Sequence, residues 1–291
     1  MSVPAAFFVT VLIWATTPLA IKWSGDGPGF LFGVSARMSI STLLCLVLMW
    51  SLSRSLPWRN GAWKVYVAAA IGFYGAMMCV YWGAQQQPSG MISVIFGLTP
   101  LFTSGLAYYL LKEQSLAPHK VFGMLLGFAG LVVIFFNDLS GGNTLAGLLA
   151  ILLAVVLHAL STVMVKRVAI ELNPLSVTTG GLLIALPLYL LTWWWVDGSW
   201  PDDLSVRAMS SILYLAVFGS VLGFLLYYYV LRNSSASQVG LIPLLTPVIA
   251  LLLGFQFNGE PITEHAVIGT AMILLGSSLH QWGKRWLPKF L

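Results

Sequence analysis

Charge is scarce in this chain of 291 residues: Asp, Glu, Lys and Arg make up 8% of it, whereas 58% is hydrophobic and the mean hydropathy is +0.89. A soluble domain of this size covers its surface with far more charge, so the composition excludes a water-soluble fold. Cysteine is almost absent as well. Cys45 and Cys79 both lie in long apolar runs, which excludes a disulfide framework and indicates two small apolar residues.

Long apolar runs, by contrast, fill most of the chain. A spanning helix needs about 20 predominantly apolar residues to cross the hydrocarbon layer. No Lys or Arg precedes the first run, which continues to Lys22, so we expect a full span there and not a cleavable signal peptide. The sequence predicts an all-α integral membrane protein with ten transmembrane helices, at about 4–23, 29–51, 65–84, 89–111, 121–137, 145–166, 174–196, 208–231, 236–257 and 265–283.

Basic residues are distributed unevenly over the loops between these spans. One side of the membrane receives only Lys22 and Arg207. The side of both termini receives Arg54, Arg59, Lys64, Lys112, Lys120, Lys166, Arg167, Arg232, Lys284, Arg285 and Lys289. Cytoplasmic loops carry the excess of Lys and Arg, so both termini are predicted to be cytoplasmic. The scattered cations give no basic face, and we expect no nucleic-acid partner.

Two stretches repeat the same pattern 147 positions apart. Leu98-Thr99-Pro100 is followed by Glu113, and Leu245-Thr246-Pro247 by Glu260. Such a repeat indicates a duplication, with residues 1–140 as the first five-helix repeat and 141–291 as the second. Because five is odd, the second repeat enters the membrane from the opposite side, so the two repeats are inverted. Transporters built in this way hold their substrate between the repeats.

The same features resemble the EamA family of the drug/metabolite transporter superfamily. The resemblance rests on ten spans, on Ile13-Trp14-Ala15 in the first span, on Arg37 in the second, and on the duplicated Leu-Thr-Pro pattern with its glutamate. It implies a carrier of the bacterial inner membrane that exports amino acids or related metabolites. It also implies a central cavity lined by helices one, three, four, six, eight and nine.

Candidate site residues follow from these helices. His158 lies mid-span with Ser161 on the same face, and ionisable residues inside membranes usually face the bundle interior; the alternative is an imidazole that bridges two helices. Tyr74, Met78 and Tyr81 form a stripe on helix three, for which packing is the alternative. The candidate substrate-binding residues are Trp14, Thr17, Tyr74, Met78, Tyr81, Ser93, Phe96, His158, Ser161, Phe224 and Tyr228.

Three further features each allow two interpretations. Pro100 and Pro247 displace the carbonyls of Phe96 and Pro243, and they act as paired hinges around a mid-membrane site or as sources of helix curvature. The Arg37 guanidinium satisfies backbone carbonyls or reaches toward the interface. Glycines of helices five and ten permit close packing, either within the chain or in a homodimer.

The sequence thus predicts a secondary transporter, with uptake by the same fold as the alternative. An integral membrane enzyme is the rival from another class, but no acid lies within a span and the four histidines are dispersed, so we expect no catalytic residue, metal or cofactor. For the energy source we expect facilitated diffusion or weak proton coupling through His158.

Overall fold

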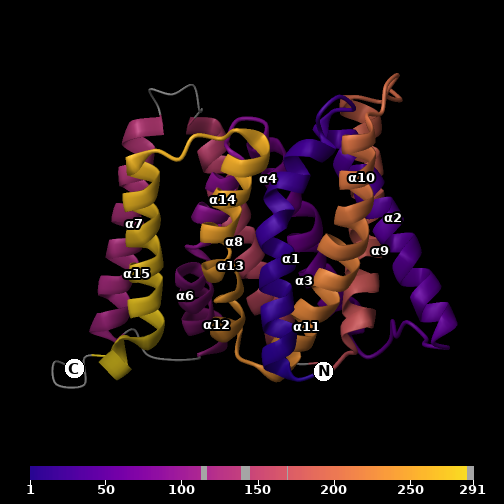
Figure 1. Ribbon diagram of the computed structural model, residues 1–291. Coiled ribbons are helices and arrows are strands. Elements are labelled where there is room, and N and C mark those ends of the chain that lie inside the picture. Colours follow the sequence, from indigo (N-terminus) through magenta and orange to yellow (C-terminus); the bar gives the residue numbers. More distant parts are fainter. Residues whose placement is uncertain (113–116, 139–144, 169, 287–291) are drawn as a thin grey trace.

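The computed structural model describes residues 1–112, 117–138, 145–168 and 170–286 (Figure 1). These residues form helices and connecting turns and contain no strand. The elements are α1 (Val3–Ser24), α2 (Phe30–Ser51), α3 (Ala62–Ala70), η1 (Ile71–Ala76), α4 (Met77–Ala84), α5 (Ser89–Phe96), α6 (Thr99–Leu111), α7 (Pro118–Asp138), α8 (Leu145–Val168), α9 (Pro174–Val196), α10 (Val206–Tyr214), η2 (Leu215–Leu222), α11 (Gly223–Asn233), α12 (Ala236–Val239), α13 (Ile242–Leu245), α14 (Pro247–Asn258) and α15 (Glu264–Trp286).

Eight stretches of helix in the described chain are long and apolar enough to cross a membrane. Each agrees within three residues at either end with a span expected from the sequence. The other two expected spans coincide with α7, whose apolar part Pro118–Ile134 is shorter, and with α15. The protein is therefore an all-helical membrane protein, and a ten-span count stays a prediction.

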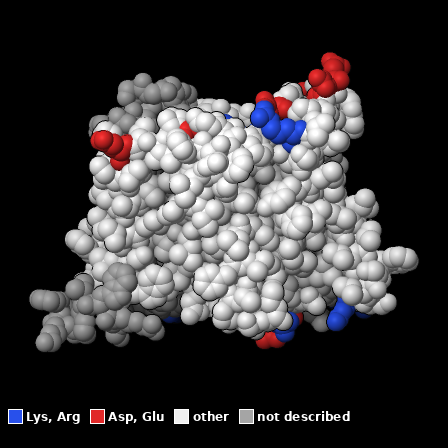
Figure 2. Space-filling model, viewed as in Figure 1, with Lys and Arg blue, Asp and Glu red and all other residues white. Residues whose placement is uncertain are grey.

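The surface agrees with this assignment. On the face shown in Figure 2, the charged side chains lie near the upper and lower edges, and a broad uncharged band separates them. Large apolar side chains are exposed on the outside of the bundle, including Trp195, Leu125 and Leu43. Such a surface suits contact with lipid.

Helix ends are set by local signals. The Asn173 side chain accepts a hydrogen bond from the Leu175 amide at 3.0 Å, and Pro174 begins α9. Ser235 and Gln238 form a capping box at the start of α12. These caps satisfy amides that have no partner within the helix. The same helix α9 ends before Gly198, whose φ of +64° is left-handed.

The third and eighth spans each contain a π-helical segment. In the third span η1 lies between α3 and α4, and in the eighth η2 lies between α10 and α11. A π-helix closes i→i+5 hydrogen bonds and therefore changes which residues face a neighbour, often at functional sites. Gly72 in η1 and Gly219 in η2 are 147 positions apart, so the irregularity recurs at equivalent places.

The fourth and ninth spans are broken at the repeated Leu-Thr-Pro pattern. Helix α5 ends at Phe96 and α6 begins at Thr99, while α13 ends at Leu245 and α14 begins at Pro247. Each threonine hydroxyl donates to the carbonyl that lies four residues before the proline. Thr99 Oγ1 is 2.5 Å from Phe96 O, and Thr246 Oγ1 is 3.0 Å from Pro243 O. The threonines thus supply the hydrogen bond that each proline removes.

Glycines bring α7 and α15 into backbone contact, and the two helices stand together at one end of the bundle (Figure 1). A Cβ added to Gly123 would lie 2.4 Å from Gly276 O, and one added to Gly130 would lie 2.6 Å from Gly269 O. These glycines therefore serve packing within the chain. A homodimer through the same two helices stays a prediction. Glu113, the glutamate of the first repeat, lies outside the described residues.

Candidate functional site

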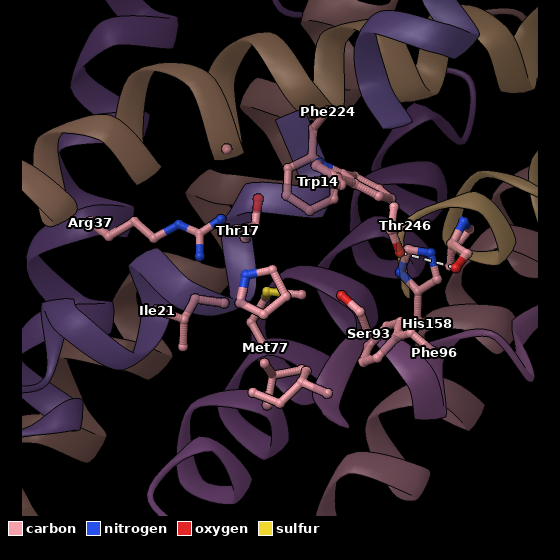
Figure 3. A pocket seen from close by; sticks show the side chains of 15 residues that line it. Trp14, Thr17, Ile21, Arg37, Met77, Ser93, Phe96, His158, Phe224 and Thr246 are labelled. Atoms are coloured by element: carbon pink, nitrogen blue, oxygen red, sulfur yellow. Dashed lines mark hydrogen bonds between the residues drawn. The ribbon is translucent and has the colours of Figure 1, made fainter. Parts of the chain in front are cut away.

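A cavity lies among the helices that carry the repeated motifs (Figure 3). The space free of protein atoms there is about 570 Å³, a figure that includes volume open to the outside. Its walls come from both halves of the chain. The lining residues are Trp14, Thr17, Pro18, Ile21, Arg37, Met77, Val80, Ile92, Ser93, Phe96, His158, Gly219, Phe224, Pro243 and Thr246.

Equivalent positions of the two halves line this cavity in pairs. The pairs are Trp14 with His158 at a separation of 144, Met77 with Phe224 at 147, and Phe96 with Pro243 at 147. A cavity at an arbitrary place in the bundle has no reason to collect both members of such pairs. The site therefore lies where corresponding helices of the two halves meet.

Aromatic rings form one wall of the cavity. The Trp14 ring stacks on Tyr227 at a centroid distance of 5.0 Å and meets Phe224 edge-on at 5.4 Å. His158 lies 5.8 Å from Trp14 and 6.0 Å from Phe96. Edge-on and offset contacts of this kind hold the rings in fixed orientations, so the wall is a preformed apolar surface.

Arg37 is the charged side chain of the cavity lining. It follows Phe30, the first residue of α2, by seven positions, which is about 10 Å of helix, and only 1% of its surface is exposed. Its Nε donates to Ser220 Oγ at 2.9 Å and its Nη1 to the Tyr81 hydroxyl at 3.4 Å. A Cβ at Gly219 would come within 3.3 Å of Nη2, so this glycine leaves the space that the guanidinium occupies.

A second set of polar residues, the Glu260 cluster, lies at the end of the bundle where α1 ends. It comprises Lys22, Ser89, Gly90, Asn258 and Glu260. The Glu260 carboxylate accepts hydrogen bonds from the Ser89 amide at 2.9 Å, the Ser89 hydroxyl at 2.8 Å, the Gly90 amide at 3.2 Å and Asn258 Nδ2 at 2.8 Å. Lys22 Nζ lies 3.8 Å from Glu260 Oε1 and donates to the Gln87 carbonyl at 2.9 Å.

Glu260 lies in the loop between α14 and α15, outside the spans. Burial alone raises the pKa of its carboxyl, but the hydrogen bonds from Ser89, Asn258 and Gly90 stabilise the charged form, and the net pKa is lowered from the usual 4.5. The carboxylate caps the N-terminus of α5, where the helix dipole also favours negative charge. This glutamate of the repeated pattern therefore joins the second half of the chain to the first.

The structure brings six of the candidate substrate-binding residues together around the cavity: Trp14, Thr17, Ser93, Phe96, His158 and Phe224. The other five lie elsewhere. The Tyr74 hydroxyl is 2.7 Å from Thr192 Oγ1 in α9, Ser161 Oγ donates to Ala68 O at 2.8 Å, and Tyr228 stacks on Phe224 behind the cavity wall. The Tyr81 hydroxyl accepts a hydrogen bond from Arg37, and neither Tyr81 nor Met78 is part of the lining. Pro100 and Pro247 also lie outside the lining, at the helix breaks.

On the third span, the cavity is lined by a different face from the expected one. The stripe of Tyr74, Met78 and Tyr81 assumes a uniform turn of 3.6 residues, whereas Met77 and Val80 line the cavity. The π-helical segment η1 lies directly before Met77, and a segment of this kind changes which residues face a neighbour. Sequence periodicity gives no sign of such a segment.

Two other lining residues, Met77 and Pro243, could have been predicted from the repeat. Met77 is the counterpart of Phe224 and Pro243 that of Phe96, each at the separation of 147. Applying this offset to the candidate residues identifies both. Pro18, Ile21, Ile92 and Gly219 carry no chemistry that distinguishes them from neighbouring apolar residues.

Known proteins resemble the chain over most of its length. It is 28% identical over 274 residues to an uncharacterized transporter of Archaeoglobus fulgidus, covering 92% of this chain and 94% of that protein. It is 27% identical over 229 residues to protein PecM of Dickeya dadantii, covering 76% and 74%. A crystal structure superposes with a TM-score of 0.74 over 98% of both chains at 21% identity, which shows a shared fold.

A family model, described as the EamA-like transporter family, matches residues 2–136 and again 145–280. These two segments cover nearly the whole chain. The motifs that resemble this family in the sequence lead to the same assignment. The chain is a membrane protein of the EamA-like transporter family.

Proposed function

We propose that this chain is an inner-membrane secondary transporter that exports amino acids or related small metabolites by alternating access. In this proposal the substrate binds in the cavity, and both termini are cytoplasmic. The substrate-binding residues are those that line the cavity, and Pro100 and Pro247 act as hinges. The outward direction and the substrate class rest on the resemblance to exporters of the family.

One observation carries the proposal. The cavity is lined by equivalent positions from both halves, with Trp14 and His158 as one such pair. The repeated Leu-Thr-Pro breaks lie beside it, and their carbonyls are held by threonine hydroxyls. Irregular backbone at membrane depth is tolerated where it is buried in protein or lines a cavity. Broken helices around a central site are typical of secondary transporters.

The proposed layout of two inverted five-helix repeats is supported by the same features. The family model matches two segments of similar length, and the π-segments and Leu-Thr-Pro breaks recur in both. With five spans in each half, the second half is inverted relative to the first. This geometry supports alternate opening of the cavity to either side by movement of one repeat against the other.

Transport in sealed vesicles tests the function. Purified protein in liposomes, loaded with mixed radiolabelled amino acids and related carboxylates, is expected to accelerate their release down the gradient. Pro100→Ala and Pro247→Ala are each expected to change that rate in a protein that still inserts and folds. Empty liposomes and a Glu171→Ala variant are the controls. No flux above empty liposomes for any compound contradicts a carrier function, and accumulation in cells that express the protein contradicts the outward direction.

Reporter fusions test the topology separately. Fusions after Gly61 and at the C-terminus are expected to be cytoplasmic, and a fusion after Asp202 is expected to be external. An external C-terminal fusion contradicts the ten-span, inverted arrangement even if transport is observed.

A further inference from the structure

We propose that the cavity binds an organic anion: a carboxylate pairs with Arg37, and an apolar or aromatic body lies against the ring wall of Trp14, Phe96 and Phe224. This inference rests on the proposed transport function and narrows its substrate class. It excludes cationic substrates and gives Arg37 a binding role.

Arg37 is a buried cation without an acidic partner in the described chain. The three ion pairs among the described residues join Lys22 to Glu260, Arg207 to Asp26 and Arg232 to Glu171, and none includes Arg37. The hydrogen-bond acceptors of its guanidinium are the hydroxyls of Ser220 and Tyr81, which carry no charge. A guanidinium has five N–H donors, so this arrangement leaves donors for another acceptor.

The position of Arg37 makes that acceptor a ligand. Burying a charge is costly unless it is paired, and an ionisable residue inside a membrane protein usually marks a substrate path. The guanidinium lies at the cavity wall and its side chain extends toward the space between Thr17 and Met77 (Figure 3). Arginine presents a planar fork that matches a carboxylate with two parallel hydrogen bonds.

The rest of the cavity defines the body of the ligand. Opposite Arg37, Figure 3 shows Ser93, Phe96, His158 and Thr246, so the polar groups there are two hydroxyls and an imidazole. No Asp or Glu belongs to the cavity lining of the described chain. An ammonium group would therefore find no carboxylate partner, whereas a phenyl, indolyl or alkyl group would find aromatic faces. The expected order of binding is monocarboxylate, then amino acid, with amines last.

The test uses ligands that share a body and differ in the head group. Phenyl, indolyl and straight-chain alkyl compounds are each supplied as the carboxylate, the primary alcohol and the primary amine, at equal concentration, to the purified full-length protein. Ligand-induced change in melting temperature measures binding. At least one carboxylate is expected to stabilise the protein while its alcohol and amine do not. This comparison needs no variant, so it stands even if a substitution at Arg37 prevents folding.

Substitutions of Arg37 then test whether this residue binds the carboxylate of the ligand. Arg37→Gln is expected to weaken carboxylate binding by about tenfold or more, since a charge-assisted pair is lost. Arg37→Lys is expected to retain part of the affinity, because it keeps the charge without the planar fork. Arg207→Gln, which removes an exposed arginine paired with Asp26, is the matched control and is expected to bind like the wild type.

The outcomes separate this inference from the proposed function. Equal stabilisation by alcohol and carboxylate, no stabilisation by any carboxylate, or unchanged affinity in Arg37→Gln overturns the anion site. If vesicles then still transport a neutral or cationic metabolite, the transporter stands and only the substrate class fails. If carboxylates bind through Arg37 but no flux occurs, the site stands and the transport function fails.

Discussion

The Glu260 cluster and the cavity differ in the partners that they give to buried polar groups. In the cluster, the cation Lys22 and the unsatisfied amides of α5 meet a carboxylate. In the cavity, the cation Arg37 meets hydroxyls, and the freed carbonyls of the two helix breaks also meet hydroxyls. In the cluster the positive charge of Lys22 is therefore paired with Glu260, whereas in the cavity the positive charge of Arg37 has no acidic partner in the described chain.

This difference distinguishes a structural polar group from a binding one. A buried ion with its counter-ion and all its hydrogen bonds in place holds two segments together, and removing one partner is strongly destabilising. A buried ion held only by neutral groups keeps the capacity to pair with a ligand. Burial alone does not make this distinction, since both Arg37 and Glu260 are buried.

The largest expected effect is the loss of the Glu260 carboxylate. Glu260→Ala leaves two buried amides, the Ser89 hydroxyl and Asn258 Nδ2 without their acceptor and Lys22 without its counter-ion. We expect a loss of about 3 kcal/mol in stability. The matched control is Glu171→Ala, whose carboxylate is 84% exposed in a pair with Arg232 and contributes about 1 kcal/mol or less. Thermal unfolding in detergent measures both. Equal shifts in the two variants would remove the distinction between the cluster and an ordinary surface pair.

The pH dependence of stability follows from the same carboxylate. The folded-state pKa of Glu260 is lowered from 4.5, so its contribution is fully present above about pH 4.5 and is lost as the pH falls through the folded-state value. The gap in melting temperature between wild type and Glu260→Gln is expected to stay constant above that pH and to narrow below it. A gap that widens on acidification would show that the carboxyl is held in its protonated form.

The threonines of the two helix breaks are expected to have a smaller effect. Thr99→Val and Thr246→Val each remove one neutral hydrogen bond to a freed carbonyl, which costs about 1 kcal/mol. Thr246 lines the cavity and Thr99 does not. Both variants should therefore melt earlier by a similar amount, while transport falls more in Thr246→Val. If either variant lost as much stability as Glu260→Ala, the threonine hydroxyls would stabilise the protein as strongly as the Glu260 carboxylate does, which would contradict this prediction.

The smallest expected effects on stability are those of removing the two cations, Lys22 and Arg37. Lys22→Met removes an ion pair at 3.8 Å whose lysine side chain is 31% exposed. Because Glu260 keeps its four hydrogen bonds in this variant, we expect a loss of only about 0.5 kcal/mol. Arg37→Met removes a buried charge that has no acidic partner in the described chain, so stability should stay unchanged or rise, while carboxylate binding is lost. Melting temperatures of the two variants, measured side by side, check the order. A larger loss of stability in Arg37→Met would assign the guanidinium a structural role.

The sequence predicted most of the fold because lipid leaves few choices. Apolar run length predicted eight spans to within three residues at either end, and the repeated Leu-Thr-Pro pattern marks both helix breaks. Trp14 and His158 were among the candidate residues in the sequence, and both line the cavity. His158 was noticeable because an imidazole is rare in an apolar run. The sequence did not predict the π-segments, which depend on how one turn packs against its neighbours. It also did not predict that Met77 and Val80 line the cavity in place of Met78 and Tyr81.

Arg37 shows a different limit. Its residue type and depth were visible in the sequence, and the two interpretations considered for it were carbonyl capping and reach toward the interface. Its actual partners, Ser220 and Tyr81, lie 183 and 44 positions away. Only the folded arrangement shows that no acid of the described chain comes near it.

The contact between Glu260 and Ser89 also orders the events of synthesis. The two residues are 171 positions apart, so at about 5 to 20 residues per second the ribosome needs on the order of 10 to 30 s to deliver the glutamate after α5 has been made. During this interval the first amides of α5 lack their carboxylate. The N-terminus of α5 in the first half of the protein therefore receives its cap only after most of the second half has been made.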